Sequence, residues 1–165
     1  IDWICRRTFD AVASTPPAAT ARVYAPVERC TLNIDDISAT TSVVVSDNGS
    51  TVSAANIQWE PLNGLGDDRR TTSYYRIRLL NGLAWSRCGD PEATVSVRSS
   101  YWGWTAVPDA IEHANLVGAK DLFNLRDARF GTAGFGEFGL VRVRENAQVL
   151  MLCEPYIRRD RIGIA

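Results

Sequence analysis

The chain has 165 residues, of which 45% are hydrophobic and 22% charged, and its formal net charge is −1. This size and composition fit one folded domain, or one domain with a large insertion, and exclude wholesale disorder, a collagen-like repeat and a coiled-coil rod. No apolar run approaches the roughly 18 residues of a transmembrane helix, so we expect a soluble protein without a membrane partner. The near-neutral charge argues against a nucleic-acid-binding domain, which carries a clear basic excess.

The sequence of residues 1–20 indicates the end of a helix, whose start is absent, followed by an extended segment that crosses to the next part of the chain. Ile1, Ile4 and Cys5 fall on one helical face. Pro16 and Pro17 cannot continue a helix.

Residues 21–100 have the pattern of antiparallel β structure. The sequence Asp47-Asn48-Gly49-Ser50 follows a run of valines, and Asn48-Gly49 is typical of a two-residue hairpin turn. Apolar residues alternate with polar ones around 75–80 and 93–98, which predicts half-buried strands. We expect an inserted β-sandwich or barrel-like block.

In residues 101–156, apolar residues again recur at the three- and four-residue intervals typical of a helix. A helix is predicted from about 108 to 127, with Pro108 at its start and a buried face formed by Ile111, Ala114, Gly118, Leu122 and Leu125. A glycine- and phenylalanine-rich loop, a short strand and a short helix follow; Asn146 caps that helix and Pro155 ends it. Residues 157–165 form a basic and apolar tail. The predicted class is therefore α+β, a small helical core interrupted by the β insertion.

The sequence contains no recognisable catalytic or metal-binding pattern. Its one histidine, His113, has neither a nucleophile-elbow serine nor a second histidine to work with. Gly134 to Gly139 match G-x-G-x-x-G, but the segment follows a helix and precedes a strand, the reverse of a dinucleotide site. The acidic pairs Asp35-Asp36 and Asp67-Asp68 are interpreted as solvated turn residues. We expect no enzyme and no cofactor.

The cysteines and tryptophans are interpreted mainly as packing residues. Cys5, Cys30, Cys88 and Cys153 have no ligand spacing and are favoured as buried thiols in a reducing compartment, although a disulfide stays open. The five tryptophans favour core or interface positions over sugar-stacking platforms. They are Trp3, Trp59, Trp85, Trp102 and Trp104.

Several motifs occur in an order that points to a known family. Tyr101-Trp102-Gly103-Trp104 leads to Pro108, then come a helix, Arg126-Asp127-Ala128-Arg129-Phe130-Gly131, the loop Ala133-Gly134-Phe135-Gly136-Glu137-Phe138-Gly139, and Glu154-Pro155-Tyr156. Ile4 to Phe9 match the family's aromatic N-terminal stretch. In these motifs the chain resembles the head-to-tail adaptor, or connector, proteins of long-tailed double-stranded DNA bacteriophages.

The resemblance implies a structural virion protein of the phage neck, assembled in the host bacterial cytoplasm. Its partners would be the portal protein, neighbouring adaptor subunits in a ring expected to be dodecameric, a stopper or tail terminator protein, and DNA passing transiently through the lumen. The candidate interface residues form three groups. The portal-docking tail comprises Ile157, Arg158, Arg159, Arg161, Ile162 and Ile164; the inter-subunit loop comprises Phe130, Gly134, Phe135, Gly136 and Phe138; the junction comprises Trp102, Trp104 and Pro108.

Two other functions remain as alternatives. The first is a β-sandwich binding module that recognises carbohydrate through Trp59 or Trp85. The second is a small hydrolase that uses His113.

Overall fold

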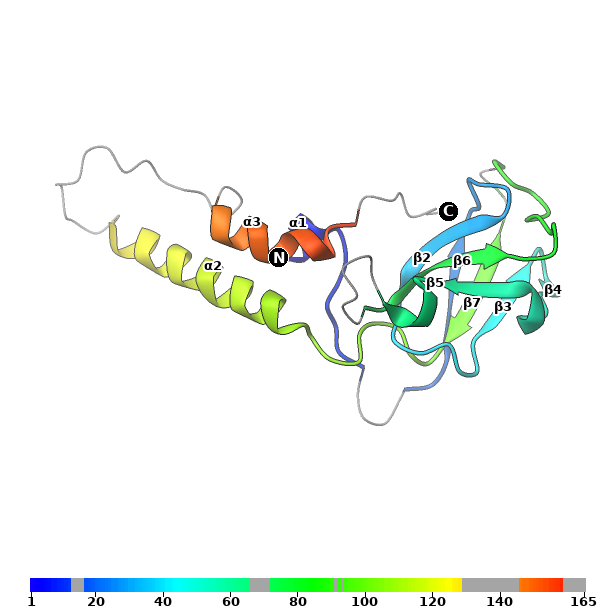
Figure 1. Cartoon of the computed structure of the whole chain (residues 1–165), viewed down its shortest axis with the longest axis horizontal. Coiled ribbons are helices and arrows are strands. Elements are labelled where there is room, and N and C mark those ends of the chain that lie inside the picture. The colour runs from blue at the N-terminus through cyan, green and yellow to red at the C-terminus, as the bar shows by residue number, and fades with distance from the viewer. Residues whose placement is uncertain (13–16, 66–71, 91, 93, 129–145, 159–165) are drawn as a thin grey trace. The chain divides into compact units, whose positions relative to one another are not determined.

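The fold is described from a computed structural model of the chain, which describes residues 1–12, 17–65, 72–90, 92, 94–128 and 146–158. Helices and antiparallel strands are both present (Figure 1), so the predicted α+β class is confirmed. The chain divides into two compact units. Residues 1–7 and 107–158 form a helical unit, and residues 8–106 form a β unit.

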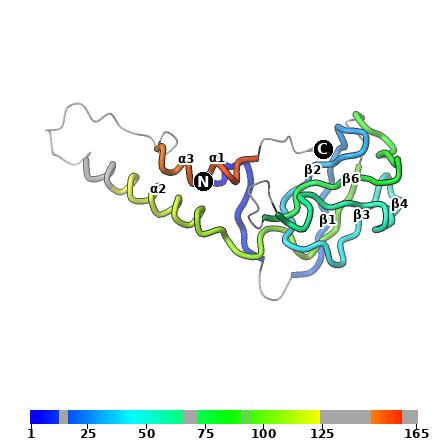
Figure 2. The backbone as a smooth tube through the Cα atoms, in the orientation of Figure 1, coloured from blue at the N-terminus to red at the C-terminus, as the bar shows by residue number. Residues whose placement is uncertain are grey.

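The helical unit brings together two segments from opposite ends of the chain. Its elements are α1 (Asp2–Cys5), α2 (Asp109–Ala128), α3 (Ala147–Cys153) and a short 3₁₀ turn, η4 (Glu154–Tyr156). The helix predicted over 108–127 is thereby confirmed. Figure 2 shows the backbone of α2 running alongside α3, and the two helices are in contact.

The α-helix α3 ends at Cys153, just before Pro155, as predicted. Pro155 itself lies in η4, the 3₁₀ turn that follows α3 directly and ends at Tyr156. Proline is tolerated there because the first residues of a helical turn need no backbone N–H donor.

The β unit contains two antiparallel sheets and no closed barrel among its described strands. One sheet has the order β1-β7-β3-β4 and the other β2-β6-β5. The first comprises β1 (Thr20–Tyr24), β7 (Val95–Ser99), β3 (Val44–Asp47) and β4 (Ser50–Thr51). The second comprises β2 (Thr31–Ile37), β6 (Tyr74–Leu79) and β5 (Ile57–Glu60). Two further 3₁₀ turns are η1 (Ala54–Asn56) and η2 (Leu62–Gly64).

The hairpin predicted at Asn48-Gly49 is confirmed. It joins β3 to β4, with Asp47 opposite Ser50. Asn48 and Gly49 have φ angles of 46° and 83°. Positive φ at both central residues is the requirement that the asparagine–glycine pair meets.

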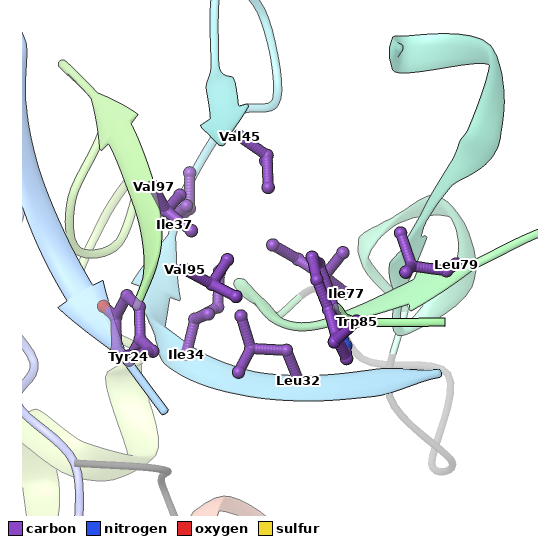
Figure 3. Packing of buried hydrophobic residues seen from close by; sticks show 10 residues of the cluster. All are labelled: Tyr24, Leu32, Ile34, Ile37, Val45, Ile77, Leu79, Trp85, Val95 and Val97. Carbon is purple, nitrogen blue, oxygen red and sulfur yellow. The ribbon is translucent and has the colours of Figure 1, made fainter. Parts of the chain in front are cut away.

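Apolar side chains from both sheets meet in one core (Figure 3). The alternation predicted in β6 and β7 is present, because Ile77, Leu79, Val95 and Val97 are buried while Arg98 is exposed. The ten buried members of this core are Tyr24, Leu32, Ile34, Ile37, Val45, Ile77, Leu79, Trp85, Val95 and Val97.

Candidate functional site

The tryptophan–glycine–tryptophan motif forms a hydrogen-bonded seam within the β unit. On one side, Gly103 N donates to Asp36 O at 2.7 Å, at the end of β2. On the other side, Trp104 N donates to Asp10 O at 2.9 Å and Val12 N donates to Trp104 O at 2.7 Å. Residues 101–104 therefore connect β2 to residues 10–12, which come from the start of the chain.

Gly103 is the residue that makes this close approach feasible. Its φ is +109°, and a Cβ added at this position would lie 2.3 Å from Asp10 O. A real Cβ cannot approach a carbonyl oxygen so closely, and an L side chain strains at this φ. The motif needs glycine here because another backbone segment occupies the place of a side chain.

The two tryptophans beside Gly103 have different environments. Trp104 is buried; its Nε1–H donates to Thr8 O at 3.1 Å, and its ring centroid lies 5.3 Å from that of Phe9. Trp102 is half-buried, and its Nε1–H donates to Thr20 O at 3.1 Å. Both tryptophans belong to the β unit, whereas Pro108 belongs to the helical unit.

A charged network lies beside Trp102. Arg22 places its guanidinium carbon 4.4 Å from the Trp102 ring centroid and donates to Asp35 Oδ2 at 2.7 Å. The Tyr24 hydroxyl donates to the same oxygen at 2.9 Å. Burial and the nearby Asp35 carboxylate raise the pKa of Tyr24 above its ordinary value of 10.0, so this phenol remains a donor at neutral pH.

The interpretation of Asp35-Asp36 as solvated turn residues is wrong. Both lie in β2, where Asp36 is buried and accepts a hydrogen bond from the Ser73 hydroxyl, while Asp35 is half-buried. The pairing of β2 with β6 shifts register between Asn33 and Ile37, and this irregularity places Asp36 and Ile37 in the interior together. Asp67-Asp68 lie outside the described residues.

In the helical unit, Pro108 and Asn146 begin the two longer helices. Pro108 O accepts from Ile111 N at 2.8 Å and from Glu112 N at 3.1 Å. Asn146 Oδ1 accepts from Gln148 N at 2.9 Å and from Val149 N at 3.2 Å, which confirms the predicted cap of α3. The Asn146 amide also donates to Asp121, which connects the start of α3 to α2.

The buried face of α2 agrees only in part with the predicted one. Ile111, Ala114 and Gly118 are buried, but the Leu122 side chain is 60% exposed. The helix that packs against α2 is α3, which has seven residues, and the spacing in α2 does not show which of its turns α3 covers. The Leu125 side chain lies outside the described part of α2.

The opposite side of α2 carries a second, exposed set of apolar residues. Leu116 is 71% exposed and Phe123 is 57% exposed, and Ala119 between them is also exposed. The spacing of three, four and seven residues places all three on one side of the helix. We call Leu116, Ala119 and Phe123 the outer face of α2. These three residues were not among the expected interface residues, although their spacing in the sequence already indicates a second apolar stripe on the helix.

Most of the predicted interface residues are not described. The inter-subunit loop residues Phe130, Gly134, Phe135, Gly136 and Phe138 lie outside the described part of the chain, as do Arg159, Arg161, Ile162 and Ile164 of the tail. Two tail residues are described. Ile157 is half-buried and Arg158 is buried in the helical unit, where Arg158 N donates to Cys5 O at 2.9 Å.

The carbohydrate alternative finds little support in the β unit. Trp85 is 3% exposed and belongs to the core, so it cannot stack on a sugar ring. Trp59 is half-buried and packs against that core. An open hollow of about 500 Å³ lies beside the β3–β4 hairpin, and the described residues lining it, among them Asp47, Thr51 and Asn56, include no aromatic side chain.

The hydrolase alternative gains no catalytic group from the described residues. His113 lies on α2, where its side chain is exposed to solvent. No group of three or more His, Cys, Asp or Glu side chains in the described ranges could hold a metal ion. In the same ranges, no helix combines the length and apolar character needed to cross a bilayer.

Comparison of the chain with known proteins gives no match to a protein-family model, a curated protein or a solved structure.

Proposed function

We propose that this chain is a head-to-tail adaptor of a tailed bacteriophage. Copies of it form a ring beneath the portal, link the portal to the stopper or tail terminator protein, and leave a lumen for DNA. The role is structural and uses no cofactor. The ordered motifs from Tyr101 to Tyr156 suggest the family, and the observation that carries the assembly role is the outer face of α2.

The outer face of α2 has the properties of a protein–protein contact. Leu116 and Phe123 are large apolar side chains, and each exposes more than half of its surface. Single exposed apolar residues are ordinary, whereas aligned ones on a helix already packed on its other side favour burial by a partner. A helix side with this pattern is suited to pack against another helix.

The helical unit also exposes a second apolar set on different elements. Trp3 of α1 is 59% exposed and Met151 of α3 is 70% exposed. A closed ring of identical subunits needs two different contact surfaces on each copy, because every contact joins one surface to the other. We infer that the outer face of α2 packs against the surface around Trp3 and Met151 of the neighbouring copy.

The charge balance is compatible with a DNA conduit. A net charge of −1 supplies no strong general attraction for phosphate. A lumen that lets DNA pass without trapping it must attract the phosphates only weakly.

The test is capture of the protein on purified portal rings of the same phage. Leu116→Glu places a charge in the outer face of α2, whereas Asn115→Glu adds the same charge at the adjacent exposed position, about 100° around the helix. We expect the first variant to lose ring formation on the portal and the second to keep it. Equal capture of both variants and the unchanged protein would refute the role of this face.

A shortened chain tests the tail separately. The truncation should follow Arg158, because removing Arg158 would also break its hydrogen bond to Cys5 inside the helical unit. We expect the truncated protein to keep its folded stability and to bind portal rings at least tenfold more weakly, a loss of about 1.4 kcal/mol. Unchanged binding would remove residues 159–165 from the portal contact.

A further inference from the structure

Two cysteines lie where the two sequence segments of the helical unit meet. Cys5 is the last residue of α1 and Cys153 is the last residue of α3, and both are fully buried. They are 148 positions apart in the sequence. Because the helical unit is assembled from residues 1–7 and 107–158, these two side chains lie across the join between its two segments.

Three contacts hold the two segments together near these cysteines. Cys5 Sγ lies 3.9 Å from Cys153 O. Arg158 N donates to Cys5 O at 2.9 Å, and Arg7 Nη1 donates to Tyr156 O at 3.4 Å. Each cysteine, together with a residue that follows it, is therefore hydrogen-bonded to the opposite segment, and these contacts hold the two thiols near each other.

The Cys153 thiol is also close enough to affect the pKa of Cys5. Burial, with a smaller effect of the neighbouring Cys153 thiol, raises the pKa of Cys5 to about 12 from its ordinary value of 9.0. A buried thiol with a raised pKa reacts slowly, because the thiolate is the nucleophile. The Cys5 thiol is therefore expected to react slowly in the folded protein, although the rate of this reaction does not limit how stable the bond is once it has formed.

We propose that Cys5 and Cys153 form a disulfide bond when the protein equilibrates with a small disulfide such as oxidised glutathione. One cysteine thiolate attacks the glutathione disulfide and releases one glutathione thiolate, leaving a mixed disulfide. The second cysteine thiolate then displaces the other glutathione. One S–S bond breaks and one forms, the two protein thiols lose two electrons and two protons, and two molecules of reduced glutathione result.

The other cysteines provide an internal comparison. Cys30 and Cys88 belong to the β unit. Cys88 is exposed and its thiol donates to Val27 O at 3.4 Å. We expect Cys88 to form only a mixed disulfide with glutathione, so a variant with both Cys30→Ser and Cys88→Ser isolates the proposed pair.

The bond would join the two segments of the helical unit covalently. It would close a loop through nearly the whole chain, and long closed loops restrict the unfolded state most. The inference stands apart from the proposed function, because it rests only on contacts inside the helical unit.

The test is a thiol–disulfide titration of the full chain carrying Cys30→Ser and Cys88→Ser. The protein is equilibrated with mixtures of reduced and oxidised glutathione, both in buffer and in about 8 M urea, which unfolds it. The samples are then quenched in acid, and the disulfide bonds are identified by peptide mass mapping. We expect the Cys5–Cys153 bond to be favoured roughly 100-fold more in the folded than in the unfolded protein. Adding Cys153→Ser must abolish the bonded product. An equal or smaller preference in the folded protein would overturn the proposal.

Discussion

Substituting Gly103 with alanine tests the seam that closes the β unit. The added Cβ would lie 2.3 Å from Asp10 O and 3.3 Å from Asp10 C, at a backbone φ of +109°. The left-handed conformation costs a non-glycine residue about 1–2 kcal/mol, and overpacking adds about 1–3 kcal/mol. We expect Gly103→Ala to lower the free energy of unfolding by about 3 kcal/mol, with a loss of roughly 8 °C in Tm.

Gly82→Ala is the matched control for this prediction. Gly82 also has a positive φ, +73°, but a Cβ there would meet nothing within 4 Å. It should therefore cost only the conformational strain, about 1 kcal/mol. Urea unfolding followed by tryptophan fluorescence and circular dichroism measures both variants. Equal losses for the two would show that no backbone occupies the space beside Gly103, and would refute our account of the motif.

Further predictions concern a helix cap, a buried carboxylate and a buried thiol. Asn146→Ala should destabilise the helical unit by about 1 kcal/mol because two backbone donors lose their acceptor, whereas Gln148→Ala at an exposed position should not; thermal unfolding compares them. Ser73→Ala should cost about 1–2 kcal/mol in urea unfolding, because it removes a donor to buried Asp36. The Cys5 thiol has a pKa of about 12 when folded and 9.0 otherwise, so the unfolded chain loses this proton first and stability falls as pH rises from 9 to 12. Cys5→Ala should reduce the difference between urea midpoints at two alkaline pH values within that range; an unchanged difference would contradict the assignment.

Local sequence chemistry was enough to predict the elements that depend on few residues. Asn48-Gly49 specifies a hairpin because both residues accept positive φ, and Asn146 specifies a helix start because its side chain satisfies backbone donors. The β6 and β7 strands were predicted because alternation follows directly from the geometry of an extended chain.

Features that depend on distant partners could not be predicted in this way. Asp36 is buried because a register shift in β2 turns it inward, and its partner Ser73 lies 37 positions away. Leu122 has the spacing of a core residue, yet its side chain is exposed, because burial depends on which distant segment packs against each turn of α2. The meeting of Cys5 with Cys153 likewise depends on the two chain ends packing together, which no local pattern encodes.

The central claim is that copies of this chain assemble as a ring on a portal. The most direct measurement is native mass spectrometry of purified portal rings mixed with an excess of the protein. We predict a complex that carries one adaptor copy per portal subunit, with no stable partly filled ring, and that Leu116→Glu prevents it. Portal rings that keep their own mass in the presence of excess protein would contradict the account.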